Sequence, residues 1–111
     1  MKTIEKKLDK KWSEKIRKRD PKCRKCKKNK SRHAAHIFSR RNKATRWDLD
    51  NGLGMCGGCH IFWGHHCPVE FTEWVKKEIG VKKFNQLKKK SETIKIWQET
   101  ELEKILNVMS K

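Results

Sequence analysis

Long apolar runs and a leader pattern are both missing from this chain of 111 residues. No hydrophobic stretch approaches the ~18 residues of a membrane-spanning helix, so we expect no membrane partner. Since no signal-peptide pattern opens the chain, we expect a cytoplasmic protein whose thiols stay reduced. Gly/Ser-rich linkers and internal repeats are also absent, which predicts one compact unit.

Acidic residues are scarce, because 13 Asp or Glu stand against 30 Lys or Arg and give a net charge of +17. The imbalance lies almost wholly in residues 1–46, which carry 20 basic and 4 acidic side chains. Such one-sided charge indicates a polyanionic partner, and a merely soluble basic surface is the alternative. Five Trp and four Phe favour a folded core over disorder.

The cysteines form two pairs with metal-binding spacing, Cys23-x2-Cys26 and Cys56-x2-Cys59. Each pair places two thiolates on one tight turn, and two such turns complete a tetrahedron of sulfur around Zn²⁺. We therefore predict a closed, structural zinc site. Four free thiols or a redox CxxC pair are the alternatives. Cys67 is expected to be a buried free thiol.

Hydrophobic periodicity gives a coarse map of the elements. An apolar residue at every fourth position predicts a helix over 2–19, whose stripe we expect to pack onto the rest of the domain. The other expected elements are strands at 33–39 and 53–55, a basic loop at 40–50, a helix from about 56 to 63, and helices at 68–80, 81–90 and 92–109. The predicted class is α+β, with a basic amphipathic helix (1–21), a zinc-stapled core (22–67) and a C-terminal helical extension (68–111).

Three polar residues near the cysteine pairs suit the cleavage of a phosphodiester bond. A neutral histidine can activate the attacking water, a divalent metal can stabilise the leaving oxygen, and an amide side chain can orient the histidine or its loop. The candidates are His36 as the base, His60 as the residue that holds the metal, and Asn51 as the orienting amide. A zinc site that ties the segment together would fix their relative positions.

The stretch from Ala34 to His60 resembles the His-Asn-His (HNH) endonucleases in their ββα-metal form. It reads Ala-Ala-His-Ile-Phe-Ser-Arg-Arg, then Arg-Trp-Asp-Leu-Asp-Asn-Gly, then Cys-Gly-Gly-Cys-His. The three residues of the motif match His36, Asn51 and His60. The resemblance implies that His36 is the general base, that His60 binds a catalytic Mg²⁺ or Mn²⁺, and that Asn51 braces the loop.

A wider resemblance covers about residues 22–108. The same motifs, with the later Glu-Ile-Gly-Val-Lys-Lys-Phe and Trp-Gln-Glu-Thr-Glu-Leu, are similar to the phage lambda Rap (NinG) recombination nuclease family. This resemblance implies branched DNA as the substrate, in a bacterial or phage-infected host cell. A nuclease that resolves branched DNA needs two active sites, so a homodimer is plausible.

Two positions depart from common HNH patterns. Ala35 stands where many of these enzymes carry an Asp or His metal ligand, and Gly64 stands where others carry a second His. The catalytic ion would then rest on His60, water and phosphate, which suits Mg²⁺ or Mn²⁺. The candidates for further ligands are His33, His65 and His66. Alternatively, His65 and His66 cap a helix or face solvent, and His33 contacts phosphate.

The predicted loop between the strands is strongly basic. Its Arg40, Arg41, Lys43 and Arg46 are expected to bind the phosphates that flank the cleaved bond, without reading sequence. Trp47 and Trp63 fit the core better than they fit stacking on unpaired bases.

The leading hypothesis is a metal-dependent DNA endonuclease that hydrolyses phosphodiester bonds. A non-catalytic, zinc-stabilised nucleic-acid-binding module is the first alternative. A second is a transcription or assembly factor whose last helix, with its stripe from Trp97 to Met109, binds a partner protein.

Overall fold

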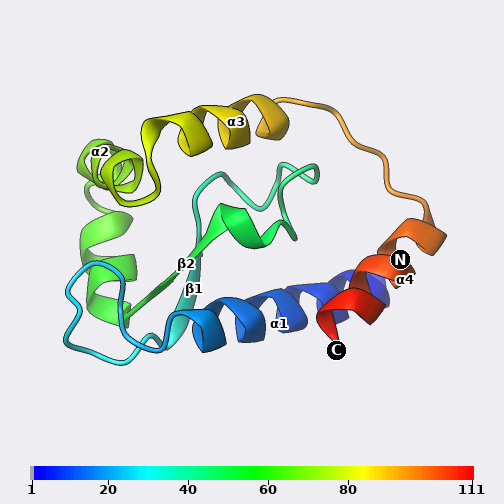
Figure 1. The fold of residues 1–111 in the computed structure, drawn as a ribbon, viewed down its shortest axis with the longest axis horizontal. Coiled ribbons are helices and arrows are strands. Elements are labelled where there is room, and N and C mark those ends of the chain that lie inside the picture. The colour runs from blue at the N-terminus through cyan, green and yellow to red at the C-terminus, as the bar shows by residue number, and fades with distance from the viewer. Residues whose placement is uncertain (1) are drawn as a thin grey trace.

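A short antiparallel hairpin lies between the N-terminal helix on one side and the helices α2 and α3 on the other (Figure 1). The computed structural model describes residues 2–111. Its elements are α1 (Lys2–Arg19), β1 (His33–His36), the short 3-10 helix η1 (Leu49–Asn51), β2 (Gly52–Met55), the π-helix η2 (Gly58–Gly64), α2 (Pro68–Ile79), α3 (Val81–Ser91) and α4 (Glu99–Met109). The predicted α+β class is confirmed, and the fold is compact. Within residues 2–111 no helix is both long and apolar enough to cross a membrane.

The two strands pair over only four residues each. Their register runs from His33 opposite Met55 to His36 opposite Gly52. The first strand is therefore shorter than the 33–39 that the sequence predicts. Its partner sets the limit, because β2 has room for four residues between η1 and Cys56. Beyond the strand, the chain turns toward Asn51, whose carbonyl accepts the Ile37 N–H at 3.0 Å.

Helix α1 packs against the rest of the molecule as the sequence predicts. Leu8, Trp12 and Ile16 are at most 2% exposed and join a hydrophobic cluster with residues of α4. Figure 1 shows α4 beside the N-terminal part of α1. Because Leu102 and Met109 are buried there, the stripe of the last helix is covered within the chain itself.

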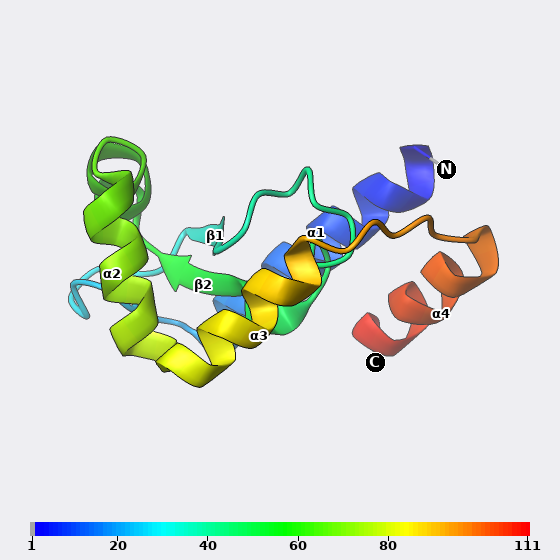
Figure 2. The same ribbon diagram turned by 90° about the horizontal axis from the view of Figure 1, so that it is seen from above.

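The last helix is shorter than the predicted 92–109, and this prediction is corrected. It begins at Glu99, and a turn at residues 92–93 and an irregular stretch at residues 94–98 connect α3 to α4 (Figure 2). Ile94 and Ile96 are 91% and 79% exposed, so they do not belong to the buried stripe. Three β-branched residues within 93–96 disfavour helix, and the Glu101 carboxylate accepts the Gln98 N–H at 3.1 Å, which marks the start of the helix.

A second hydrophobic cluster joins β2 to the helices that follow. Leu53, Met55, Val75 and Phe84 are buried in it. Trp63 is half-buried beside it, with its ring near those of Phe71 and Trp74. Trp47 is 5% exposed and belongs to the α1 cluster, so the prediction that these two tryptophans are core residues is confirmed for Trp47 and fits Trp63 in part.

Candidate metal centres and active-site cavity

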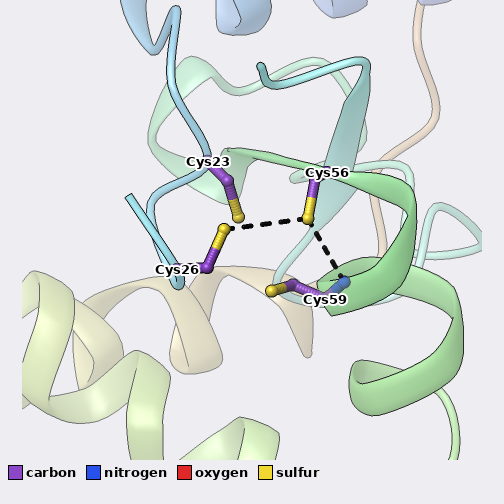
Figure 3. Close-up of side chains that lie close together, drawn as sticks. All are labelled: Cys23, Cys26, Cys56 and Cys59. Carbon is purple, nitrogen blue, oxygen red and sulfur yellow. Dashed lines mark hydrogen bonds between the residues drawn. The ribbon is translucent and has the colours of Figure 1, made fainter. Parts of the chain in front are cut away.

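The four paired cysteines converge on one point (Figure 3). Their sulfur atoms all lie within 4.8 Å of one another, and the sulfurs of Cys26 and Cys56 are 3.9 Å apart. A tetrahedral zinc with ~2.3 Å bonds to sulfur places its ligands about 3.8 Å apart. The cluster therefore fits a zinc ion. Cys67 is a half-buried free thiol outside this group, at the start of α2.

Backbone hydrogen bonds shape the first cysteine turn and attach it to the hairpin. The Cys23 carbonyl accepts the Lys27 N–H at 2.9 Å, and Lys27 adopts a left-handed φ of 60° that reverses the chain. The Arg24 N–H donates to the Gly54 carbonyl at 2.9 Å, which ties this turn to β2. The second cysteine pair begins one residue after β2 ends.

The electrostatics of the cluster favour a bound cation. Backbone N–H groups of Asn29 and Lys28 lower the pKa of the Cys26 thiol to about 6. Burial and neighbouring thiols raise the pKa of Cys59 to about 12. Four thiolates at this spacing repel one another, and a divalent metal ion removes that repulsion.

A buried carboxylate connects helix α1 to this cysteine cluster. Asp20 is 6% exposed and accepts hydrogen bonds from Arg19 at 2.7 Å, Arg24 at 3.2 Å and the Gly54 N–H at 2.9 Å. Burial acts to raise its pKa, but the bonds from Arg19 and Gly54 and the nearby Arg24 charge outweigh burial and lower it. The end of α1, the first cysteine turn and β2 are thereby held together.

A cavity of about 480 Å³ lies between α1, β1 and η2. His36 and His60 both line it, with His65 beside them. The residues that complete the wall come from α1, β1 and the loop after it: Asp9, Trp12, Ser13, Ala34, Ser39 and Arg40. The structure thus brings two of the three predicted catalytic residues to one concave site.

His36 is held by a ring stack and one hydrogen bond. Its imidazole lies parallel to the Trp12 ring, with centroids 4.0 Å apart and an interplanar angle of 9°. Its Nε2 lies 3.0 Å from the Arg46 carbonyl oxygen. Because a carbonyl only accepts, Nε2 carries the proton and Nδ1 keeps a free lone pair. Burial lowers the pKa of His36, so the ring is neutral at physiological pH.

Asn51 does not line the cavity but braces the loop next to it. Its side chain is fully buried, and its Oδ1 accepts the Phe38 N–H at 2.8 Å. Its Nδ2 donates to the carbonyls of Phe38 and Thr45, both at 3.1 Å. One amide therefore fixes both ends of the segment that follows β1, at Phe38 and at Thr45. The carbonyl that binds His36 belongs to the next residue, Arg46.

His60 lies on the π-helix within a group of three histidines. The His65 N–H donates to the His60 carbonyl at 3.2 Å, which is the i+5 bond of a π-helix. The wider turn brings the His65 ring to 4.7 Å from the His60 ring. On the other side, Nδ1 of His33 is 3.0 Å from Nδ1 of His60. Burial first, and then the neighbouring histidines, lower the pKa of His60 to about 4.

These contacts distinguish the three histidines that the sequence leaves open as further ligands. His33 and His65 both lie against His60. His66 is exposed, as His65 is, but joins neither the cavity nor the ring contacts among the described residues. Gly64 at i+4 leaves no side chain on that turn, and the π-helix instead brings the i+5 side chain next to His60.

The basic loop is partly neutralised by two acids of α1. Arg46 is 13% exposed and forms a two-pronged bond with Asp9, at 3.0 and 2.7 Å. Lys43 lies 3.4 Å from Glu5. Arg40 also reaches Asp9, at 3.2 Å, but stays 61% exposed at the rim of the cavity. Arg46 therefore anchors the loop to α1.

Sequence reasoning missed the contribution of α1 to the site. Trp12 reads as part of an apolar stripe, and only the fold shows that its ring also supports His36. Asp9, which accepts from Arg46, Arg40 and the Trp47 indole, is one of four acids in the basic first half of the chain. The scarcity of acids in this segment is the one sequence signal that could have indicated a role for Asp9. Comparisons with protein-family models, curated proteins and solved structures found no match.

Proposed function

We propose that this protein is a metal-dependent DNA endonuclease of the HNH type, with a ββα-metal core supported by a structural zinc. The observation that carries the proposal is the cavity shared by His36 and His60. A neutral base and a metal-binding imidazole in one concave site meet the two chief needs of phosphodiester hydrolysis.

His36 is the general base in this proposal. Its Nε2–H is engaged by the Arg46 carbonyl, so Nδ1 is the atom that takes a proton from the attacking water. Stacking on Trp12 holds the ring plane, and Asn51 holds the loop that supplies the carbonyl. A bound divalent ion at His60 would stabilise the charge that develops on the phosphate and the leaving 3′ oxygen.

The DNA-binding surface in this proposal is smaller than the sequence suggests. Arg40 and Arg41 remain exposed, and Arg40 lies at the rim of the cavity. We assign phosphate binding to these two residues and a supporting role to Arg46. The net charge of +17 supports a nucleic-acid substrate, and the family resemblance is the ground for proposing branched DNA.

A cleavage assay tests this function. The zinc-loaded protein is incubated with an end-labelled four-way junction and with a linear duplex of the same arm sequence, with Mn²⁺ or with no added divalent ion. We expect cleavage that requires the ion and favours the junction. Tight binding with no cut in any divalent metal would contradict the proposal and leave the non-catalytic binding module.

The pH dependence of cleavage follows from the buried His36. Burial disfavours its charged form and lowers its pKa from the ordinary value of 6.5. The unprotonated ring is the active form, so the rate is expected to fall as pH drops, with a midpoint below 6.5. Single-turnover rates in saturating metal, measured across pH 5 to 8, check this. A midpoint above 6.5 would contradict a buried histidine base.

A further inference from the structure

We propose that His33 and His60 together bind the catalytic divalent ion, an assignment that rests on the function proposed above. The two imidazoles form a chelating pair that selects a transition-metal ion such as Mn²⁺ over Mg²⁺. His33 thereby supplies the ligand that Ala35 cannot.

The distance between the two rings fits chelation. Nδ1 of His33 and Nδ1 of His60 are 3.0 Å apart. An ion about 2.1 Å from each nitrogen makes an angle of about 90° between the two bonds, which is the angle between neighbouring ligands of an octahedral ion. At this distance the two nitrogens form a hydrogen bond when one Nδ1 carries a proton. When neither Nδ1 carries a proton, both lone pairs are free to bind an ion.

The two rings come from rigid and separate elements. His33 opens β1, where it pairs with Met55 of β2, and His60 lies on η2 directly after the cysteine cluster. A Cβ added at Gly57 would lie 3.6 Å from Cε1 of His33, so the ring rests against this glycine. The zinc centre that fixes Cys56 and Cys59 therefore also fixes the distance between His33 and His60.

The position of the pair suits the chemistry of the cavity. His60 lines the cavity with His36, whereas His33 contacts His60 from outside the cavity wall, so an ion on the pair would meet the cavity at His60. The rings of His33 and His65 flank His60, with centroids 5.2 and 4.7 Å away. Open coordination positions remain for water and phosphate oxygens, as a catalytic ion requires.

The donor atoms determine which ions bind. Mg²⁺ prefers oxygen ligands and binds imidazole poorly, whereas Mn²⁺, Co²⁺, Ni²⁺ and Zn²⁺ accept nitrogen ligands. Two imidazoles therefore shift the preference from Mg²⁺ toward Mn²⁺. The four thiolates remain the stronger site for zinc, so Mn²⁺ added to the zinc-loaded protein reports on the histidine pair.

Mn²⁺ binding without DNA tests the assignment. Electron paramagnetic resonance of free Mn²⁺ measures its affinity for the zinc-loaded protein and for the variants His33→Gln, His60→Gln and His66→Gln. We expect one Mn²⁺ per chain in the wild type and a loss of affinity of about tenfold or more in the first two variants. The exposed His66→Gln is the matched control and should bind as the wild type does.

A second variant and a measurement on the unaltered chain complete the test. His33→Asp replaces a nitrogen ligand by oxygen. This variant should still bind Mn²⁺, but the ratio of its affinity for Mn²⁺ to its affinity for Mg²⁺ should be smaller than in the wild type. In the wild type, substoichiometric Mn²⁺ should broaden the imidazole NMR signals of His33 and His60 more strongly than that of His66, because the broadening falls steeply with distance from the ion.

The outcomes separate this inference from the proposed function. Mn²⁺ binding that depends on His33, with no DNA cleavage, would support the metal site and overturn the nuclease. Wild-type Mn²⁺ affinity in His33→Gln, or an unbroadened His33 signal, would overturn the histidine pair even where the protein cuts DNA.

Discussion

Removal of zinc is expected to unfold this protein. The four cysteines join the turn at Cys23 to the end of β2, where the other links are the Arg24 N–H bond to Gly54 and the ion pairs of Arg24 with Asp20 and Glu78. Binding of zinc to small four-ligand sites contributes roughly 10–16 kcal/mol, which equals or exceeds the whole stability of a typical small domain. Chelation at neutral pH should therefore abolish the helical circular dichroism, and Cys56→Ser should have the same effect.

Cys67→Ser is the matched control for the zinc experiment. This cysteine is half-buried but lies outside the metal cluster. The variant should bind one zinc per chain and melt within a few degrees of the wild type. A chain that keeps its helices and its melting temperature after complete removal of zinc would contradict the structural role of the site.

Asn51→Ala is expected to cost about 2–5 kcal/mol of folding free energy, because it leaves the Phe38 N–H and the Phe38 carbonyl without partners. The Thr45 carbonyl also loses its bond from Asn51, although it still accepts the Asp48 N–H at 3.1 Å. Cleavage should also fall, since the loop that presents the Arg46 carbonyl to His36 loses its brace. Urea unfolding and single-turnover cleavage measure the two effects.

Asn51→Asp separates the hydrogen bonds from the shape of the side chain. The new oxygen would face two carbonyl oxygens at the positions now 3.1 Å from Nδ2. Burial and this repulsion raise the pKa of the introduced carboxyl, so stability is lost at neutral pH and regained as pH falls. Equal stability of this variant and the wild type at pH 7 would contradict the bracing role.

The spacing of the residues predicted the four-cysteine cluster well. Two residues separate Cys23 from Cys26, and two separate Cys56 from Cys59, and that spacing is a local property which the chain carries into any fold. The burial of the periodic stripe of α1 was equally predictable, because the apolar face of an amphipathic helix is stabilised by packing against the rest of the protein.

Contacts between distant segments were not predictable. The stack of His36 on Trp12 joins residues of β1 and α1, and no pattern within either segment specifies it. Similarly, the π-helix that moves His65 toward His60 has no periodic signature in seven residues. The neutralisation of Arg46 by Asp9 also depends on how α1 docks against the loop.

The most direct measurement compares single-turnover cleavage of a labelled four-way junction by the wild type and by His36→Ala, with DNA binding measured on the same samples. The account predicts that the variant binds the junction as the wild type does, retains one zinc per chain, and cuts about 10²–10⁴-fold more slowly. Cleavage by His36→Ala at the wild-type rate would contradict the assignment of this cavity as the active site.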